Sequence, residues 1–377
     1  MKKMKIALFS PFCSQNYGTV LQAFSLAKVL NSLGHECEYI DWCYYKQSKW
    51  NRLKFLLRHP LYVFYRNKNQ KHRSKDLSYS FLKEDKYMSI ISKNRIFCDK
   101  YTPHVKYKYP IDELSSLEKH YDKFIVGSDQ TWSPNALYQY SPYYLSFIKD
   151  SSKKASYACS CGTTNLPSNF RTFLGLKLKS FDKLSCREQT NAASLTSLLN
   201  KDVNCVLDPT LLVNRENWSN YFLPVENMPK KYILCYILGE KKNISEYAEK
   251  LGREKSLPVY YILTRPTYEN KQNVLQGVGC QEFLWLIDNC EYLVTDSFHG
   301  TIFALNFGRN FISFDKHPTE TSYDNGRLLE ILSAVQLESH YHIDSNEEMP
   351  AEIDYSKVSC VLAEKREKSL MYLRSLL

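Results

Sequence analysis

Short apolar runs alternate with segments of helical periodicity along most of this sequence, and this alternation limits the possible folds more than any other feature. Near the start, the apolar run Lys5–Ser10 precedes a polar loop that ends at Gly18, and residues 19–33 carry apolar side chains at helical spacing. Further strand-like runs lie at 37–42, 124–127 and 155–160, with helical segments at 170–184 and 188–199. Strands that alternate with helices predict an α/β fold with parallel sheets.

The second half of the chain repeats this alternation. Strand-like runs lie at 232–238, 259–263, 292–295 and 311–314, and helical patterns at 245–255, 281–289 and 301–307. A single core stops growing at about 250–300 residues, so the 377 residues predict two domains, 1–205 and 206–377. Pro209 supports this boundary because proline cannot continue a helix. We expect the last helix, 356–377, to pack back on the N-terminal domain.

The positive charge of the chain is concentrated in one segment. The sequence has 50 Lys and Arg against 40 Asp and Glu, and residues 44–75 hold ten of the basic residues and no acidic one. The rest is therefore neutral, since 50 − 10 equals 40. This basic insertion also carries an apolar stripe at helical spacing, interrupted by Pro60, which consists of Trp50, Leu53, Leu57, Leu61 and Phe64.

Two interpretations of the basic insertion remain open. A basic amphipathic helix with aromatic residues is typical of binding to an anionic membrane surface. Alternatively, the stripe packs on the domain's own core and the charges are solvated. Nucleic acid is not an expected partner, because no nucleic-acid-binding motif accompanies the charge.

Several classes of protein are excluded. No run of about 20 apolar residues is present to span a membrane, and the first apolar run is too short for a signal peptide. The 12 cysteines include no Cys-x-x-Cys, and no His/Asp/Glu cluster has metal-ligand spacing, so we expect neither a disulfide framework nor a metal site. Reduced thiols indicate a cytoplasmic protein.

The segment Thr295–Thr301 is the strongest local indication of chemistry. A predicted strand ends near Thr295 and a helix begins near Thr301, which places His299 where backbone N–H groups favour an anion. The alternative is structural: Ser297 or Thr301 caps the helix and His299 is an ordinary loop histidine.

Three weaker candidates lie elsewhere in the chain. Asn16-Tyr17-Gly18 lies in the first loop without a dinucleotide-binding glycine pattern, and a structural turn with Gly18 in the left-handed region is the favoured interpretation. Asp129 and Gln130 follow the run 124–127, where the carboxylate either forms a local turn or binds a hydroxyl. Arg187 is, on pattern alone, a surface arginine.

Read together, these motifs resemble the polysaccharide pyruvyl transferase family over most of the chain. The matching segments occur in the family's order: 16–22 (NYGTVLQ), 126–132 (VGSDQTW), 155–158 (ASYA), 186–188 (CRE), 207–212 (LDPTLL) and 296–301 (DSFHGT). Each is short, and their order makes them specific. The basic insertion and Cys159-Ser-Cys161 depart from the usual pattern.

The resemblance implies two Rossmann-like domains that face each other across a cleft, as in the GT-B fold, and a pyruvyltransferase reaction. Phosphoenolpyruvate is the implied donor, a glycan or a polyprenyl-diphosphate-linked sugar is the acceptor, and the product is a pyruvate ketal. No cofactor or metal is implied.

The resemblance also implies roles for individual residues. His299 matches the general acid, and Arg187 a cation that holds the donor. Donor contacts are further expected from Ser297, Gly300, Thr301 and Arg327, and acceptor contacts from Asn16, Tyr17, Gly18, Asp129 and Gln130. Since a helix N-terminus disfavours an imidazolium, we expect donor binding to promote the charged form of His299.

The motifs and the basic insertion allow three functions. The leading hypothesis is a cytoplasmic pyruvyltransferase of cell-surface polysaccharide synthesis, attached to the inner membrane face by residues 44–75. The second is a GT-B glycosyltransferase that uses a nucleotide sugar. The third is a non-catalytic protein that binds the membrane surface.

Overall fold

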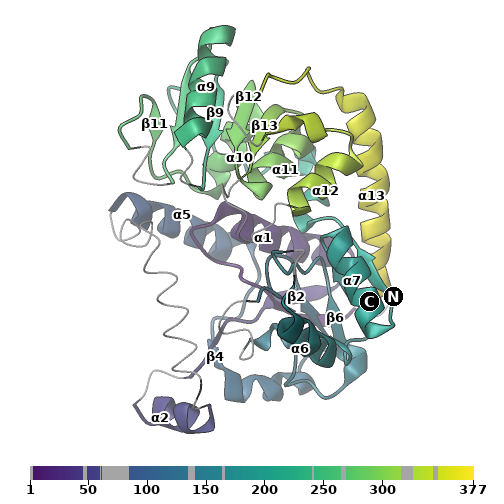
Figure 1. Ribbon diagram of the computed structural model, residues 1–377. Helices are drawn as coiled ribbons and strands as arrows, with labels where there is room; N and C mark the ends of the chain where they lie inside the picture. The colour runs from purple at the N-terminus through teal and green to yellow at the C-terminus, as the bar shows by residue number, and fades with distance from the viewer. Residues whose placement is uncertain are drawn as a thin grey trace.

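Two parallel sheets form the framework of the protein (Figure 1). The computed structural model describes residues 3–45, 49–59, 61, 85–134, 141–163, 166–239, 242–264, 269–315, 326–342 and 347–377. The N-terminal sheet has the order β2 (Glu36–Tyr39), β1 (Lys5–Phe9), β5 (Lys123–Val126) and β6 (Lys154–Ser156). The C-terminal sheet has the order β11 (Val274–Leu275), β10 (Val259–Ile262), β9 (Ile233–Tyr236), β12 (Tyr292–Thr295), β13 (Asn310–Phe314) and β14 (Tyr341–His342).

All strand pairs within the described ranges are parallel, which confirms the predicted α/β fold class. In the N-terminal sheet, Ala7 of β1 lies between Glu38 of β2 and Phe124 of β5. Ile6 to Phe9 are all buried, as expected for a strand that is covered on both faces. The carboxyl ends of these strands therefore point their loops toward one edge of the sheet, where ligands of α/β proteins usually bind.

Helices flank both sheets. In the N-terminal part, the helices are α1 (Tyr17–Ser32), α5 (Asp85–Tyr101), α6 (Ser168–Leu178) and α7 (Gln189–Leu199). This part also contains a small sheet of two strands, β3 (Trp42–Cys43) and β4 (Tyr109–Pro110). In the C-terminal part, the helices are α8 (Arg215–Ser219), α9 (Lys242–Lys255), α10 (Cys280–Asn289), α11 (Phe298–Phe307) and α12 (Gly326–Ala334).

The helix predicted for residues 170–184 is too long. The helix α6 ends at Leu178, and Leu184–Cys186 is instead the strand β7, which pairs with β8 (Val203–Cys205). Single bridges at Lys183 and Cys186 join β7 to the β6 region. The helix was predicted to continue past Leu178 because the apolar residues of a short buried strand cannot be distinguished by spacing from those of a buried helical turn.

The helix predicted to begin at Thr301 begins three residues earlier. Helix α11 starts at Phe298, and the Ser297 side chain accepts a hydrogen bond from the Gly300 N–H as its N-cap. His299 therefore lies in the first helical turn and not in the loop before it.

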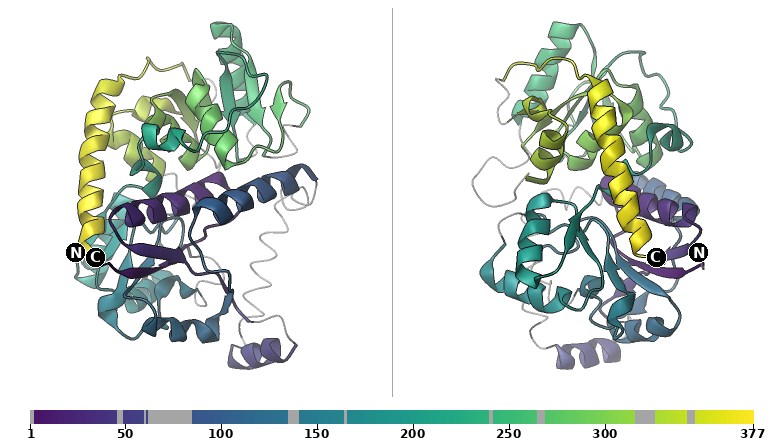
Figure 2. Two further views of the ribbon diagram at one scale, coloured as in Figure 1. Left: turned by 180° about the vertical axis from the view of Figure 1, so that it is seen from behind. Right: turned by 90° about the vertical axis from the view of Figure 1, so that its right-hand side faces the viewer.

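The last helix, α13 (Tyr355–Ser375), runs along the side of the molecule from the C-terminal sheet toward the N-terminal one (Figure 2). Tyr372 Oη donates to the Ser156 carbonyl at 2.9 Å, and Ser369 Oγ accepts from the Leu207 N–H at 2.9 Å. These buried bonds join α13 to the end of β6 and to the segment that leads into the C-terminal part.

Helix α2 (Lys49–Arg58) is the described part of the basic insertion, and it ends just before Pro60. Phe64 and the basic residues beyond Arg58 lie outside the described residues. The interpretation that the apolar stripe packs on the domain's core is wrong for Trp50, Leu53 and Leu57, which are exposed. Among the described residues, no helix is long and apolar enough to cross a membrane.

Candidate functional site

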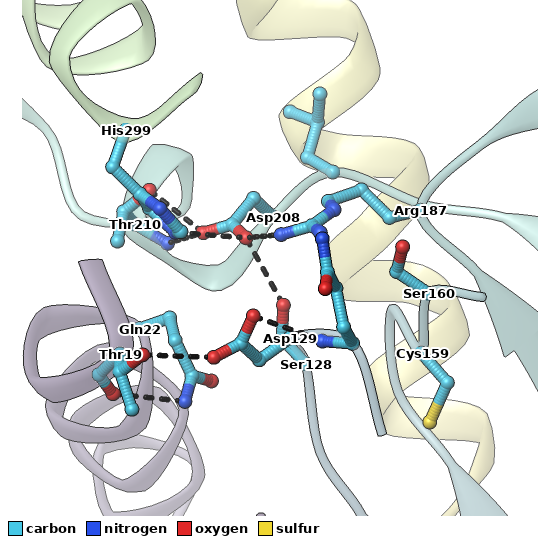
Figure 3. Close-up of polar contacts among 12 residues, drawn as sticks. Thr19, Gln22, Ser128, Asp129, Cys159, Ser160, Arg187, Asp208, Thr210 and His299 are labelled. Carbon is cyan, nitrogen blue, oxygen red and sulfur yellow. Dashed lines mark hydrogen bonds and ion pairs between the residues drawn. The ribbon is translucent and has the colours of Figure 1, made fainter. Parts of the chain in front are cut away.

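A buried carboxylate, Asp208, lies at the centre of the polar residues between the two sheets (Figure 3). Its Oδ1 accepts from the Thr210 N–H at 3.0 Å and from Thr210 Oγ1 at 2.8 Å. Its Oδ2 accepts from Arg187 Nη1 at 2.8 Å and from Ser128 Oγ at 3.0 Å. These bonds connect β5, β7 and the turn Pro209–Leu211, so Asp208 holds together loops that are far apart in the sequence.

The charge of Asp208 is maintained by its neighbours. Burial by itself would raise the pKa of the carboxyl, but His299 and Arg187 lower it well below its usual range. Asp208 is therefore ionised at neutral pH and presents a negative charge to both basic side chains.

Arg187 is buried directly after β7, contrary to the expectation of a surface arginine from pattern alone. Besides Asp208, its Nε donates to Glu188 Oε1 at 3.3 Å. Burial would lower the pKa of Arg187, but the charges of Glu188, Asp208 and Asp129 raise it. Its Nη2 atom is buried and has no hydrogen-bond partner among the described residues. A buried guanidinium N–H without a partner is costly, and an anionic ligand would satisfy it.

A second guanidinium lies close to the first. The Cζ atoms of Arg187 and Arg327 lie 4.5 Å and 5.3 Å from the centre of the Phe298 ring, at the start of α11. Burial and repulsion by Arg187 lower the pKa of Arg327 to about 10. The two like charges are thus held near one ring, an arrangement that favours a ligand with two anionic groups.

His299 completes this group from the C-terminal side. Its Nε2 atom lies 3.7 Å from Asp208 Oδ2, too far for a hydrogen bond but close enough for charge attraction when the imidazole is protonated. Nε2 is buried and, within the described part of the chain, has no hydrogen-bond partner. The imidazole is therefore held beside a carboxylate with one nitrogen unused.

Gly18 packs directly against this imidazole. A Cβ atom built at position 18 would lie 2.0 Å from His299 Nδ1, a distance that no side chain could adopt without displacing the ring. The left-handed turn predicted for Gly18 is wrong, because Gly18 is the second residue of α1 and its φ is not in that region. Glycine is needed here for close approach between the two parts of the chain.

Asp129 reaches the same place from the N-terminal sheet. Its Oδ2 accepts from Thr19 Oγ1 of α1 at 2.9 Å, and its backbone has a φ of 83°. Such a conformation is strained for a residue other than glycine, and strained residues are common at functional sites. The next residue, Gln130, is exposed and lies against Gly162.

A cavity of about 610 Å³ adjoins the two arginines. Its lining includes Arg187, Asp208, Phe298 and Arg327, with Glu330 of α12 and Lys365 of α13. A volume of this size is sufficient for a small anionic metabolite.

Some predicted site residues have other roles in the structure. The Asn16 side chain accepts from the Thr19 N–H as the N-cap of α1. Tyr17 is buried, its ring stacks on Phe283 at 4.5 Å, and its Oη donates to the Val278 carbonyl at 2.7 Å. The structure therefore places Tyr17 in the contact between the two parts of the chain.

The predicted donor contacts of α11 are also occupied within the fold. Ser297 caps the helix, and the buried Thr301 Oγ1 bonds to the Ser297 carbonyl and to Ser313 Oγ at 2.6 Å. A side chain at Gly300 would collide with Thr295. These residues position His299, and their hydroxyl groups are buried away from the cavity lining.

Sequence reasoning missed Asp208, Ser128, Thr19 and Glu188 as members of the site. Asp208 lies within the family motif 207–212, beside the predicted domain boundary, and no role in the site was predicted for it. The available signal was an aspartate directly before a proline. Its partners Arg187 and His299 are contributed by separate elements.

The sequence that carries this site matches the model of a known family. The model described as polysaccharide pyruvyl transferase matches residues 16–318, which is most of the chain. The protein belongs to the polysaccharide pyruvyl transferase family. Membership makes it a transferase and confirms the resemblance. Gly18, Asp129, Arg187, Asp208 and His299 all lie within the matched residues, whereas Arg327 lies beyond them.

The search of curated proteins finds no match to this pyruvyl transferase family member. Similar solved structures include a putative UDP-N-acetylglucosamine 2-epimerase from Listeria monocytogenes, with a TM-score of 0.49 and 10% identity over 98% of this chain and 91% of that chain. The UDP-GlcNAc 2-epimerase from Methanocaldococcus jannaschii has a TM-score of 0.48 and 14% identity over 96% and 92%. Phytolacca americana UGT2 has a TM-score of 0.43 and 11% identity over 100% and 94%. Likeness at this level says nothing about the substrate.

Within the described ranges of this pyruvyl transferase, no group of three or more His, Cys, Asp or Glu residues could hold a metal ion. The expectation that the reaction needs no cofactor stays a prediction.

Proposed function

We propose that this protein transfers the enolpyruvyl group of phosphoenolpyruvate to two hydroxyls of a sugar, which forms a pyruvate ketal and releases phosphate. Family membership supports the transferase class. The observation that carries the choice of donor is that two buried polar atoms, Arg187 Nη2 and His299 Nε2, lack partners while both side chains adjoin Asp208 Oδ2. A small dianionic ligand would satisfy both.

The two arginines are suited to the two anionic groups of the donor. Guanidinium groups bind carboxylate and phosphate oxygens in a bidentate manner. Arg187 is fixed by Asp208 and Glu188, so its geometry does not have to be ordered when the donor binds. Arg327 shares the Phe298 ring and its pKa is lowered by Arg187, so an anion between them would relieve their repulsion.

His299 is suited to protonate the donor. Histidine is the usual general acid near neutral pH. The ionised Asp208 at 3.7 Å stabilises the imidazolium, which offsets the unfavourable effect of the α11 N-terminus. Gly18 allows the imidazole to pack against α1 and thereby fixes its orientation.

The steps balance in atoms and protons. His299 donates a proton to the methylene carbon of phosphoenolpyruvate, and the adjacent carbon becomes oxocarbenium-like. A sugar hydroxyl forms a C–O bond to that carbon, the bond to phosphate breaks, and the second hydroxyl closes the ring. Of the two hydroxyl protons, one restores His299 and the other leaves with phosphate.

The acceptor is expected to lie beside Asp129 and Gln130. Gln130 is exposed, and Asp129 is partly exposed and electrostatically coupled to Arg187 and Arg327. A carboxylate and an amide are suitable partners for sugar hydroxyls. The acceptor is a glycan or its polyprenyl-diphosphate-linked precursor.

The direct test is to incubate the purified protein with isotope-labelled phosphoenolpyruvate and candidate acceptor glycans. We expect the label in the glycan, at the mass of a ketal, with one phosphate released for each ketal formed. Turnover of a nucleotide sugar without phosphoenolpyruvate would instead support the glycosyltransferase alternative and overturn the proposal. Mass analysis of the native polysaccharide, with and without this protein, identifies the acceptor.

A further inference from the structure

Among the described residues, helix α2 contacts the N-terminal part through the side that carries Phe55 and Arg58. Phe55 is 1% exposed and lies near the rings of Tyr44 and Tyr45, with centroid distances of 6.1 Å and 5.5 Å. Arg58 Nη1 lies 2.7 Å from Asp112 Oδ2. These contacts hold α2 at the end of the molecule far from the C-terminal sheet (Figure 2).

The opposite face of α2 is apolar and exposed. Trp50 is 71% exposed, Leu53 is 47% exposed and Leu57 is 73% exposed. Their spacing of three and four residues places them on one side of the helix, and the exposed Leu61 follows one turn later in the sequence. Contiguous apolar side chains at a surface are typical of an interaction site.

Lys49 and Lys54 border this apolar stripe. Both are exposed, as is Arg52 on the far side of the helix, and α2 contains no acidic residue. At about 100° per residue, Lys49 lies on one side of the stripe and Lys54 on the other. An apolar stripe between cations is the arrangement found in helices that lie in the plane of a membrane surface.

We infer that α2 binds anionic lipid bilayers, with its basic side chains on the headgroups and Trp50, Leu53 and Leu57 inserted between them. The positive charge of α2 favours this partner over a second copy of the chain. Two copies joined through this face would bring Lys49 and Lys54 close to the same cations of the partner, with no acidic residue on α2 to compensate. An anionic bilayer satisfies the apolar and the charged groups together.

This surface is separate from the candidate active site, and the inference does not depend on the proposed reaction. Vesicle binding is measured without donor or acceptor. If pyruvyl transfer also holds, the attachment would bring the enzyme to a lipid-linked acceptor.

The test uses co-sedimentation of the full chain with vesicles of phosphatidylcholine, alone or mixed in equal parts with phosphatidylglycerol. We expect binding only to the mixed vesicles, and weaker binding at high salt because the attraction is screened. Trp50→Ser/Leu53→Ser/Leu57→Ser and Lys49→Glu/Arg52→Glu/Lys54→Glu should each weaken binding more than about tenfold.

Two control variants distinguish the face from general surface properties. Ile96→Ser/Leu176→Ser/Met371→Ser removes three exposed apolar side chains from other helices, and Lys231→Glu/Lys250→Glu/Lys357→Glu reverses three exposed charges elsewhere. Both should bind mixed vesicles as the wild type does. Trp50 emission should also shift to the blue on binding, and this shift should be absent in Trp50→Phe.

Three results would overturn the inference. The first is a wild type that does not bind the mixed vesicles. The second is binding of the mixed vesicles by both α2 variants that is as strong as that of the wild type. The third is a wild-type dimer in light scattering that becomes monomeric in the apolar α2 variant, since a second copy would then cover the stripe.

Discussion

The backbone of Gly18 lies directly against the imidazole of His299, so that a methyl group at position 18 would come within 2.0 Å of Nδ1. These residues are 281 positions apart, because 299 − 18 equals 281, and they belong to α1 and α11. The contact connects the orientation of the proposed general acid to the approach of the two parts of the chain.

Gly18→Ala should therefore impair catalysis without unfolding the protein. The added methyl group must displace the imidazole or separate α1 from α11, and a displacement of about 1 Å can reduce a rate about 100-fold. We expect kcat to fall to that extent while the thermal unfolding temperature changes little. Gly175→Ala is the matched control, since its new methyl group would meet Leu198 at an ordinary 3.4 Å. Equal kcat for both variants would exclude a positioning role for the contact.

His299→Ala tests the enzyme reading against a non-catalytic protein. Loss of a general acid reduces kcat about 100-fold or more, and Arg187 should still bind the donor, so that the donor KM changes little. Phosphate release and ketal formation are the measurements. His120→Ala, at an exposed histidine outside the site, should retain full activity. Retention of full activity by His299→Ala would rule out the proposed mechanism.

Asp208→Asn tests the buried charge through the pH dependence of stability. The variant leaves the guanidinium of Arg187 without its 2.8 Å partner, which should cost about 3 kcal/mol near neutral pH. Because the folded pKa of Asp208 lies below its usual range, this contribution is fully present above the unfolded pKa of about 3.9 and is lost as pH falls toward the folded value.

Urea unfolding from about pH 7 to pH 2.5 checks this prediction. The difference in unfolding free energy between wild type and Asp208→Asn should be constant down to about pH 5 and shrink below about pH 4. Asp202→Asn, at an exposed carboxylate, is the control and should show almost no difference. A difference for Asp208→Asn that does not change with pH would mean that the ion pair is not its origin.

Tyr17→Phe separates acceptor binding from packing. The lost hydrogen bond to the Val278 carbonyl should reduce the free energy of unfolding by about 1 kcal/mol, with no change in the acceptor KM. Tyr107→Phe, which loses a surface bond to Glu113, should change neither quantity. A higher acceptor KM with unchanged stability would restore the role that the family resemblance implied for Tyr17.

The elements of the fold that could be predicted were those whose pattern of apolar residues can be recognised within one short stretch of sequence. The run Lys5–Ser10 and the helix from Thr19 correspond to β1 and α1, because a short apolar run and apolar residues at helical spacing are distinct patterns in the sequence. The helix predicted for 170–184 included Leu184, the first residue of the strand Leu184–Cys186, because a strand of three residues is too short to show its own period.

The residue types of the candidate site were also partly predictable. His299 and Asp129 were selected because they follow predicted strands, and residues that follow parallel strands gather at one edge of a sheet. Arg187 was selected through the family resemblance alone. Their partners were not predictable. The bonds from Arg187 and Ser128 to Asp208 depend on where three separate loops end in space.

Local periodicity, helix caps and the order of short motifs in the sequence were enough to predict the α/β class, the family and several residues of the candidate site. The tertiary structure added what depends on distance between segments: the contact of Gly18 with His299, the burial of Arg187, and the outward face of Trp50, Leu53 and Leu57. The physical reason is that a residue's own neighbours in the chain specify its backbone conformation, whereas its burial and its charge partners come from elements that pack against it from elsewhere.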